Sequence, residues 1–495
     1  MSLVLGIDAS TTATKAVLVD ERGVVCGLGV HEYGYEVPRP GWSEQDPAVW
    51  WEGAIRATQS ALAQAGVDGS SVAAIGLTGQ MHGAVLLDRA DEVLRPAILW
   101  NDQRSAAECD LIRSVVGPER LIRVTGNDAV TGLTAPKLVW VREHEPEVWG
   151  RVAHVLLPKD YVRLRLTGEH AMDKADGSGT LLFDLARRDW STLMLEALEI
   201  HASWMAPTYE GPEVTGRVSA AAAAATGLAA GTPVVAGGGD QAANAVGVGA
   251  VSAGVVALSL GTSGVVFAST DEPLHDPRGR VHAFCHAVPR TWNMMSVMLS
   301  AAGSLRWFRD AIAPDTSFAD LVGPAADVHA ARDGLYFLPY LTGERSPHAD
   351  PDARGAFVGI DVTHDRRHLT RAVLEGVAFG LRDGLELMVE AGTPRPTQIR
   401  ASGGGLASPL WGQLLADVLE AEIALPTTTE GAAYGAALTA SVASGWFPSV
   451  QQACTTLVSA HPVAAPGESA GGYGEWYGAY RELYPALAAW FHSRR

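Results

Sequence analysis

The sequence predicts an α/β protein made of two similar domains that face each other across a central cleft. The chain has 495 residues, whereas a single domain usually holds about 100–250 residues. Two segments, LGIDASTTATKAVLV at Leu5–Val19 and VALSLGTSGVVFA at Val256–Ala268, each read as a buried strand, a turn of small and hydroxyl residues, and a second buried strand. They lie about 250 residues apart, near the starts of two halves, and such a repeat predicts two copies of one domain.

The first half opens with a three-strand meander followed by a helix and further short strands. The glycine-rich segment Gly237–Asp240 marks the end of this half, so we expect the domains at residues 1–242 and 243–495. The expected strands are Leu3–Ile7, Lys15–Val19, Val24–Val30, Val72–Leu77 and Ala84–Leu87, and the expected helix is Ala48–Ala65.

The second half alternates strands and helices. The expected strands are Gly334–Leu338 and Ile399–Ser402, and the expected helices are Leu369–Glu390, Pro409–Leu419 and the small-residue segment Gly431–Ser441. The last 40 residues predict a peripheral tail and helix. Aromatic residues spaced as in Trp476, Tyr477, Tyr480 and Tyr484 more often pack within their own chain than against a partner.

Composition excludes several classes of protein. The formal net charge of −18 disfavours binding to nucleic acid or to anionic membranes. The four cysteines are far apart in the sequence, which argues against a zinc site and against a disulfide framework. The first residues lack the pattern of a secretory signal, and the longest apolar runs are shorter than a membrane span. We therefore expect a cytoplasmic protein.

The turns of the two repeated hairpins are candidate phosphate sites. In the first, Thr11 and Thr12 offer hydroxyl groups and Lys15 a positive charge, while Asp8 at the strand end is a candidate metal ligand. The second, Gly261–Ser263, has the same character. Each turn taken alone also fits an ordinary polar hairpin, but two of them facing one cleft could hold a polyphosphate from both sides.

Two glycine-rich segments are candidates for the nucleotide and for catalysis. Gly403–Pro409 lies between a strand and a helix, where helix N-termini bind anions, although it lacks the ending of a Walker A loop. Gly237–Gln241 could place Asp240 deep in the cleft as the carboxylate that accepts a proton from an attacking hydroxyl group. The alternatives are a plain strand-to-helix turn for the first segment and a turn-forming aspartate for the second.

A third group of polar residues has the character of a sugar site. Gln80–Gly83 and Ile98–Arg104 both follow strand-like runs. They combine histidine, asparagine, aspartate and arginine with Trp100, which are hydrogen-bonding and stacking residues that suit a polyol. A lone histidine after a strand is more often structural.

Longer segments show a resemblance to a known family. Gly132–Trp140 with Glu143 and His144, and Gly355–Ile360 with His368–Gly376, resemble the two signatures of the FGGY carbohydrate kinases. The similarity covers essentially the whole chain. Within this family, four segments resemble the xylulokinases, namely Gln80–Gly83, Leu99–Arg104, Thr125–Asn127 and Leu338–Arg345.

The resemblance implies a fold and a set of roles. The fold would be two ribonuclease-H-like domains of the actin-like ATPase type, with the active site between them. Catalysis would use Asp240 as general base and Asp8 near the metal ion. The expected substrate-binding residues are Met81, His82, Trp100, Asn101, Asp102, Asp240 and Gln241, and the expected ATP-binding residues are Thr11, Thr12, Lys15, Gly261, Thr262, Ser263, Gly404 and Gly405.

Two positions depart from the family pattern. Gln241 stands where some relatives have asparagine, and its longer side chain puts a direct contact with the sugar in doubt. Ser10 stands where many relatives have glycine, which weakens the case for close backbone approach at that turn.

The activity implied is ATP-dependent and Mg²⁺-dependent phosphorylation of D-xylulose at its 5-hydroxyl group, with sugar and ATP as the binding partners. One alternative is a kinase of the same family for another ketose or polyol, such as L-ribulose. A second is a non-catalytic actin-like nucleotide-binding protein, against which the carboxylate at Asp240 argues. A third, a sugar-responsive DNA-binding regulator, conflicts with the charge and with the N-terminal hairpin. The oligomeric state stays open, and the resemblance makes a homodimer a reasonable expectation.

Overall fold

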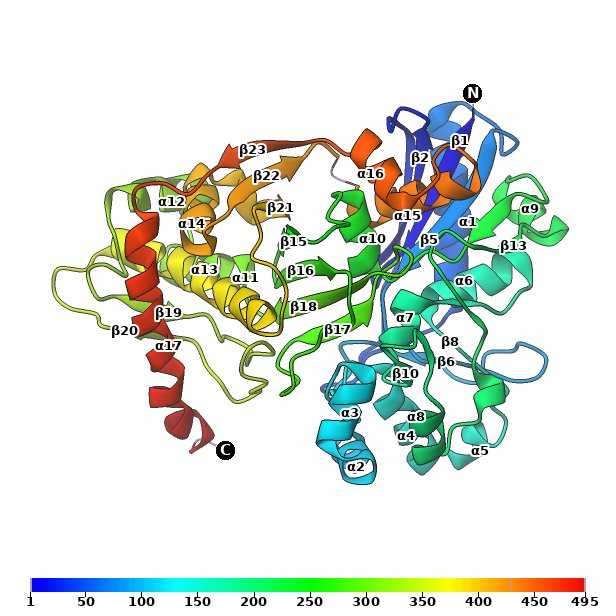
Figure 1. Ribbon diagram of the computed structural model, residues 1–495, viewed down its shortest axis with the longest axis horizontal. Coiled ribbons are helices and arrows are strands. Elements are labelled where there is room, and N and C mark those ends of the chain that lie inside the picture. Colours follow the sequence, from blue (N-terminus) through cyan, green and yellow to red (C-terminus); the bar gives the residue numbers. More distant parts are fainter. Residues whose placement is uncertain (1, 429, 494–495) are drawn as a thin grey trace.

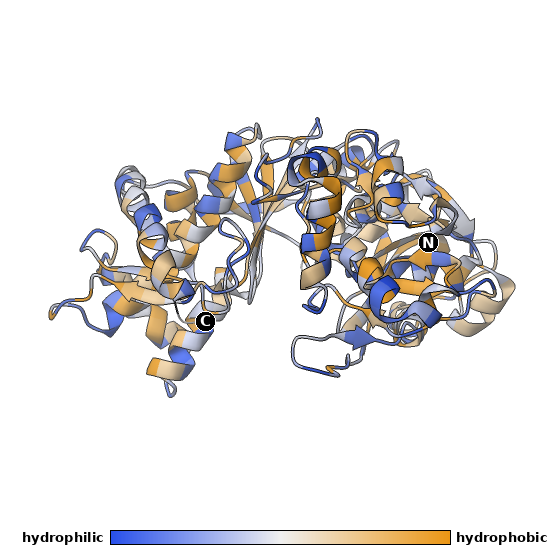
Figure 2. Ribbon diagram, turned by 90° about the horizontal axis from the view of Figure 1, so that it is seen from below, coloured by the Kyte–Doolittle hydropathy of each residue, from blue (hydrophilic) through white to orange (hydrophobic). Residues whose placement is uncertain are grey.

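The computed structural model describes residues 2–428 and 430–493 and has two lobes, each built around a mixed β-sheet (Figure 1). Hydrophobic and hydrophilic segments alternate along the helices of both lobes, and many of the loops are hydrophilic (Figure 2). The expected α/β architecture with two related domains is confirmed.

The first sheet has six strands in the order β3-β2-β1-β5-β14-β13. β1, β2 and β3 form an antiparallel meander, β5 and β14 run parallel to β1, and β13 pairs antiparallel at the edge. The strands are β1 (Leu3–Ala9), β2 (Ala13–Asp20), β3 (Val25–Glu32), β5 (Val72–Gly79), β13 (Val214–Arg217) and β14 (Pro233–Val235).

The second sheet repeats this arrangement. Its order is β17-β18-β16-β15-β21-β22-β23, with an antiparallel meander in β15, β16 and β18, two parallel strands β21 and β22, and an antiparallel edge strand β23. The strands are β15 (Val255–Leu260), β16 (Gly264–Thr270), β17 (His282–Cys285), β18 (Trp292–Met298), β21 (Gln398–Ser402), β22 (Glu422–Pro426) and β23 (Ala460–Ala464). The two similar hairpins therefore open two sheets of the same topology.

Short two-stranded ribbons and helices complete the lobes. The ribbons pair β4 (Glu44–Gln45) with β7 (Ala97–Ile98), β6 (Val85–Leu87) with β8 (His154–Leu156), β9 (Met172–Asp173) with β12 (Thr208–Tyr209), β10 (Phe183–Asp184) with β11 (Asp189–Trp190), and β19 (Tyr336–Leu338) with β20 (Ala356–Val358).

The helices of the first half are α1 (Ala48–Ala65), α2 (Ala106–Val116), α3 (Pro118–Thr125), α4 (Thr134–His144), α5 (Pro146–Trp149), α6 (Pro158–Thr167), α7 (Lys174–Ser178), α8 (Thr192–Ala197), η1 (Ala202–Trp204), α9 (Ala220–Thr226) and α10 (Asp240–Gly247). Those of the second half are α11 (Ala302–Ile312), α12 (Phe318–Val322), η2 (Gly323–Asp327), α13 (Arg366–Glu390), η3 (Gly404–Ala407), α14 (Pro409–Leu419), α15 (Gly431–Ala443), α16 (Val450–Leu457) and α17 (Ala470–His492).

Helix α15 belongs to the second half of the chain but packs on the first sheet (Figure 1). The packing is at backbone distance, since a Cβ atom added at Gly6 of β1 would lie 1.9 Å from the carbonyl oxygen of Ala433. A Cβ atom at Gly435 would lie 1.8 Å from the carbonyl oxygen of Ala243 in α10. This close approach explains why the segment is rich in glycine and alanine.

The long helix α13 begins three residues before the expected Leu369. The side chain of Asp365 accepts hydrogen bonds from the backbone N–H groups of Arg367 and His368, which caps the first turn. The aromatic face of α17 packs within the chain, as expected. The Tyr477 hydroxyl donates to Oδ1 of Asp383 on α13 at 2.7 Å, and Tyr480 is buried.

Among the described residues, no helix is long and apolar enough to cross a membrane. All four cysteines are free, and Cys109, Cys285 and Cys454 are buried.

Candidate active site

Three segments that the sequence singled out meet at the carboxyl edge of the first sheet. Asp8 lies near the end of β1, Gln80–His82 follow β5, and Gly237–Asp240 follow β14. Because these three strands are parallel neighbours, their carboxyl ends share one edge, which is where ligands bind in open α/β sheets. The N–H group of Gln80 donates to the carbonyl of Ala9 at 3.0 Å, which holds two of the segments together.

The glycines before Asp240 are required by close backbone packing. Gly237 has a φ of 75°, and a Cβ atom there would lie 1.8 Å from the carbonyl oxygen of Leu77. A Cβ atom at Gly239 would lie 2.7 Å from Cγ of Met81. The glycines therefore let the chain bring Asp240 next to the Met81 segment.

Asp240 is the first residue of α10, and Asp8 and Asp240 are both partly buried. Burial raises the pKa of Asp240 to about 7, with a further contribution from the negative charge of Asp8. Hydrogen bonds from the backbone and side chain of Gln241 act in the opposite direction. A carboxyl group with a pKa near 7 suits a general base at neutral pH.

Asp8 has an unusual environment as well. Burial raises its pKa to about 6, while a hydrogen bond from the Ser10 side chain and the charge of Lys15 oppose the rise. Its Oδ1 atom has no hydrogen-bond partner among the described residues. A buried carboxylate oxygen without a partner fits a cation ligand, so the residues present here are compatible with a bound Mg²⁺ ion.

His82 is held in a strained position. Its φ is 71°, a conformation that non-glycine residues rarely adopt and that is found mainly at functional sites. The Nδ1–H group donates to the carbonyl of Gly179 at 2.8 Å, and burial keeps the pKa of His82 well below its usual value. The ring is therefore neutral, with Nε2 left as a hydrogen-bond acceptor.

Lys137 of α4 donates hydrogen bonds to the backbone around His82. Its Nζ donates to the carbonyl oxygens of His82 at 2.8 Å and Gly132 at 2.7 Å. Burial lowers the pKa of Lys137 to about 7, with Asp102 partly offsetting this effect. Lys137 lies in the segment Gly132–Trp140, which resembles a family signature. In the structure its ammonium group holds the backbone carbonyl of His82 in place.

Trp100 and Thr11 connect the sugar-type residues with the first hairpin. Trp100 Nε1 donates to Thr11 Oγ1 at 3.0 Å, and Thr11 Oγ1 donates to Gln80 Oε1 at 3.1 Å. Trp100 as a whole residue is 41% exposed, so its ring can offer a surface for stacking. Thr12 lies in the same turn, where its carbonyl accepts from the N–H of Tyr33.

The neighbouring residues Asn101 and Asp102 differ in availability. The buried Oδ1 atom of Asn101 has no hydrogen-bond partner among the described residues, which leaves it open to a ligand. Both oxygens of Asp102 are occupied by Arg104, and Oδ2 also accepts from the N–H of Ser43 at 2.6 Å. Asp102 therefore stabilises the loop rather than presenting a free carboxylate.

The second lobe brings four of its five predicted ATP-binding residues, all but Ser263, to one cavity. Gly261 and Thr262 after β15 and Gly404 and Gly405 after β21 line a cavity of about 710 Å³. The carbonyl of Ser263 accepts from the N–H of Gly261 and closes the turn. The cavity is also lined by Arg306, Phe318 and Trp411, which the sequence gave no reason to select.

The ammonium group of Lys15 is already paired with a carboxylate. Its Nζ forms an ion pair with Glu430 Oε2 at 3.1 Å, between the first hairpin and the loop before α15. A phosphate group would compete with this carboxylate for Lys15.

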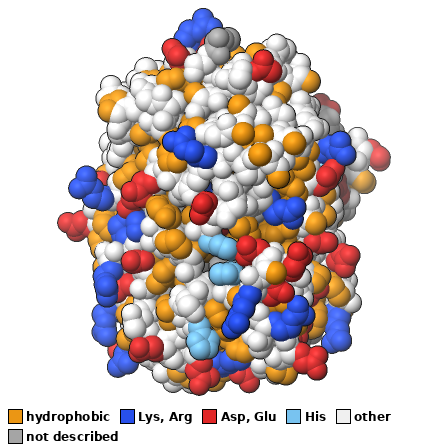
Figure 3. All heavy atoms as spheres, turned by 90° about the vertical axis from the view of Figure 1, so that its right-hand side faces the viewer, with side chains coloured by type: hydrophobic (Ala, Val, Ile, Leu, Met, Phe, Trp, Pro, Cys, Tyr) orange, Lys and Arg blue, Asp and Glu red, His pale blue; other side chains and the backbone are white. Residues whose placement is uncertain are grey.

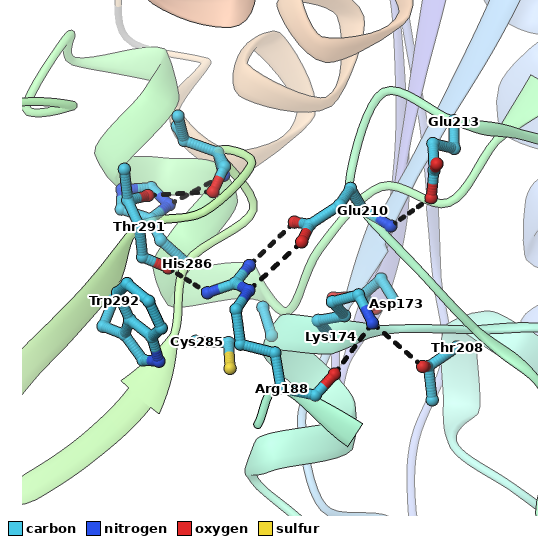
Figure 4. A network of polar contacts seen from close by, with 12 residues as sticks. Asp173, Lys174, Arg188, Thr208, Glu210, Glu213, Cys285, His286, Thr291 and Trp292 are labelled. Atoms are coloured by element: carbon cyan, nitrogen blue, oxygen red, sulfur yellow. Dashed lines mark hydrogen bonds and ion pairs between the residues drawn. The ribbon is translucent and has the colours of Figure 1, made fainter. Parts of the chain in front are cut away.

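A second connection between the halves of the chain surrounds Arg188 (Figure 4). Its guanidinium group pairs with Glu210 at 2.7 Å, donates to the carbonyl of Thr291, and lies over the Trp292 ring at 4.8 Å. Lys174 Nζ donates to the carbonyl of Arg188 at 2.8 Å. Arg188 and Glu210 belong to the first half of the chain, whereas Trp292 begins β18 and Thr291 directly precedes it. This network therefore ties the β17–β18 end of the second sheet to the first half.

Two charged residues near the site were not selected from the sequence. Oδ1 of Asp176 would lie 2.7 Å from a Cβ atom at Gly239, and Asp176 pairs with the fully buried Lys159 at 3.0 Å. Arg345 from the second half carries a charge that helps to lower the pKa of His82. Arg345 is in the xylulokinase-like segment Leu338–Arg345, which is the only signal that could have identified it; isolated acidic residues such as Asp176 give none.

Comparison with known proteins identifies the family. Residues 3–247 match the N-terminal domain of the FGGY family of carbohydrate kinases, and residues 256–444 match its C-terminal domain. A xylulose kinase from Escherichia coli (strain K12) is 45% identical over 441 residues, which cover 89% of this chain and 90% of that protein.

Solved structures agree with this assignment. The xylulose kinase from Rhodospirillum rubrum superimposes with a TM-score of 0.92 at 33% identity, covering 99% of this chain and 100% of the other. A gluconate kinase from Lactobacillus acidophilus gives a TM-score of 0.95 at 27% identity, covering 100% of both chains. The fold is therefore the actin-like, ribonuclease-H-like one expected for this family. The chain belongs to the FGGY family of carbohydrate kinases.

Proposed function

We propose that this enzyme transfers the γ-phosphoryl group of ATP to the 5-hydroxyl group of D-xylulose. The observation that carries the proposal is the position of Asp240, a carboxylate with a pKa near 7 that directly follows Gly239, which packs against Met81 at the carboxyl edge of the first sheet. The similarity to xylulose kinases over most of the chain supports this choice of sugar.

In the proposed reaction, Asp240 accepts the proton of the 5-hydroxyl group while the hydroxyl oxygen forms a bond to the γ-phosphorus atom. The bond from this phosphorus atom to the bridging oxygen of ADP breaks, and ADP leaves with that electron pair. Phosphoryl transfer needs mainly positioning and charge neutralisation from the protein.

The sugar would lie against Met81, His82, Trp100 and Asn101. Neutral His82 accepts a hydrogen bond at Nε2, Asn101 offers its unpaired Oδ1, and the exposed Trp100 ring covers an apolar face of the sugar. Gln241 donates hydrogen bonds to Asp240 and so favours the ionised form of the base. Asp102 binds Arg104 and thereby stabilises the loop that carries Trp100.

ATP would extend from the cavity lined by Gly404 and Gly405 towards the turns at Gly261–Ser263 and Thr11–Lys15. Asp8 would hold Mg²⁺, which neutralises charge on the phosphates when bound. Closure of the lobes would exclude water and limit ATP hydrolysis.

We further propose that the enzyme acts in the cytoplasm, where its cysteines stay reduced. The homodimer implied by the resemblance stays a prediction, which light scattering of the purified protein tests.

A panel of sugars with coupled detection of ADP tests the proposal. D-Xylulose should give the highest kcat/KM among D-xylulose, L-ribulose, glycerol and gluconate. A higher value for any of the others would overturn the choice of sugar, and gluconate belongs in the panel because a structural relative is a gluconate kinase. Absence of sugar-dependent ADP release with every sugar would favour the non-catalytic alternative.

A further inference from the structure

A second cluster of ligand-type side chains lies outside the candidate active site. Asp91, His154 and His170 each offer one atom, and these three atoms lie within 4.8 Å of one another. They come from three separate segments: the turn after β6, the first residue of β8, and the connection between α6 and β9. Neighbouring histidine side chains, with acidic side chains next to them, are visible on the outer face of this lobe (Figure 3).

The three ligand atoms lie close enough together to bind one ion. His170 Nε2 lies 2.8 Å from Asp91 Oδ1, and His154 Nε2 lies 4.0 Å from the same oxygen. The two imidazole rings stack with centroids 4.2 Å apart, and both Nε2 atoms lie within 4.0 Å of Asp91 Oδ1.

The fold itself fixes the positions of Asp91 and His154. Asp91 adopts a left-handed conformation with a φ of 61°, in a turn that Asp88 closes by accepting from the N–H groups of Ala90 and Glu92. His154 is in register with Leu87 of β6, which fixes its position relative to the turn.

An arginine near this turn does not compete for the Asp91 carboxylate. The positive charge of Arg151 near this turn is paired with Asp88 rather than with Asp91.

We propose that Asp91, His154 and His170 form a binding site for a divalent transition-metal ion of the Zn²⁺ class, separate from the Mg²⁺ site at Asp8. Two imidazole nitrogens and one carboxylate oxygen are ligands that zinc takes, whereas Mg²⁺ prefers oxygen ligands alone. A bound ion would join three segments at the end of the β6–β8 ribbon and stabilise the first lobe.

Calorimetric titration of the metal-free, untagged full-length enzyme with Zn²⁺ tests this site. We expect one tight Zn²⁺ ion per chain, and at least about tenfold weaker binding in His154→Ala and in His170→Ala. The matched control is His461→Ala, which removes an exposed histidine from β23 in the other lobe and should bind Zn²⁺ like the native enzyme.

Further readouts separate a metal site from a surface ion pair between His170 and Asp91. Zn²⁺ should raise the melting temperature of the native enzyme and not that of His170→Ala, and millimolar Mg²⁺ should not displace it. Kinase activity measured with Mg²⁺ alone should be the same in all variants. Equal Zn²⁺ affinity in the native enzyme and both histidine variants, or no tight binding at all, would show that only the ion pair exists.

Discussion

Asp240 and Asp8 interact through their charges: burial raises the pKa of Asp240 to about 7, and the negative charge of Asp8 adds to this rise. Burial also raises the pKa of Asp8, to about 6. Asp8 lies near the end of β1 and Asp240 begins α10 after β14, 232 positions apart in sequence, and they meet because β1 and β14 flank β5. Two carboxyl groups in one partly desolvated place cannot both ionise as freely as in water. This relationship, together with burial, favours the protonated form of the proposed base.

Replacement of Asp240 by Asn should leave ATP binding intact and lower kcat by about 10²–10⁴-fold, which is the usual contribution of a general base. Asparagine keeps the shape of the side chain but cannot accept the hydroxyl proton. Coupled ADP detection measures kcat, and calorimetry measures the affinity for ATP. Near-native turnover in this variant would remove Asp240 from the role of base.

The pH dependence of kcat/KM should show an acid limb near pH 7. Asp240 has to be ionised to accept a proton, and its raised pKa of about 7 means that the ionised fraction falls as the pH drops below this value. We expect kcat/KM for the sugar to rise between pH 6 and pH 8 by about tenfold and then level off. A flat profile across this range would contradict the assignment.

Replacement of Asp8 by Asn should move this acid limb to lower pH. Removing a neighbouring negative charge makes ionisation of Asp240 easier, so its pKa falls. The measurement is the pH profile of the residual activity. Glu21→Gln is the matched control, because it also removes one negative charge but does so at an exposed turn after the opposite end of the β1–β2 hairpin.

The sequence predicted the fold well because its signals are local and strong. The strand–turn–strand pattern at Leu5–Val19 and at Val256–Ala268 marked the starts of both sheets, and the helices Ala48–Ala65 and Pro409–Leu419 begin and end where their apolar spacing indicated. Capping by Asp365, which extends α13 towards the N-terminus, depends on side-chain geometry that spacing does not show.

The candidate site was predictable only in part, because local sequence signals do not show which distant residues come together. The segments that follow parallel strands could be selected one by one, but their partners could not. The pairing of Lys15 with Glu430 joins residues from opposite ends of the chain, and the engagement of Asp102 by Arg104 depends on how one loop folds. Packing of α15 on the first sheet likewise crosses the expected domain division, and no local pattern indicates it.

Replacement of Lys137 by Met should weaken sugar binding more than ATP binding. The change removes the Lys137 hydrogen bonds to the carbonyl oxygens of His82 and Gly132, and the His82 carbonyl keeps only the longer bond from Thr134 Oγ1 at 3.2 Å. We expect the free energy of unfolding to fall by about 1–3 kcal/mol. His82 would then relax from its strained conformation, and we expect KM for the sugar to rise by at least about tenfold.

Steady-state kinetics with each substrate varied in turn measures this effect. Lys174→Met is the control, because Lys174 also donates to a backbone carbonyl but does so at Arg188, away from the His82 segment. A similar change in KM for the sugar in both variants would mean that general destabilisation, rather than the His82 segment, is responsible.

Replacement of Gly404 by Ala should weaken ATP binding without disturbing the fold. An added Cβ atom at Gly404 has no neighbouring atom within 4 Å, so the free enzyme accommodates it, whereas at Gly405 it would lie 2.5 Å from Cδ2 of Leu260. Because Gly404 lines the 710 Å³ cavity, the extra methyl group would occupy space that the proposed site gives to the nucleotide. We expect KM for ATP to rise by about tenfold or more, with an unchanged melting temperature and unchanged KM for the sugar.

Gly471→Ala on α17, another position with no atom within 4 Å, is the matched control and should behave like the native enzyme. Unchanged KM for ATP in Gly404→Ala would place the nucleotide elsewhere, since the substitution alters little besides the space in this cavity.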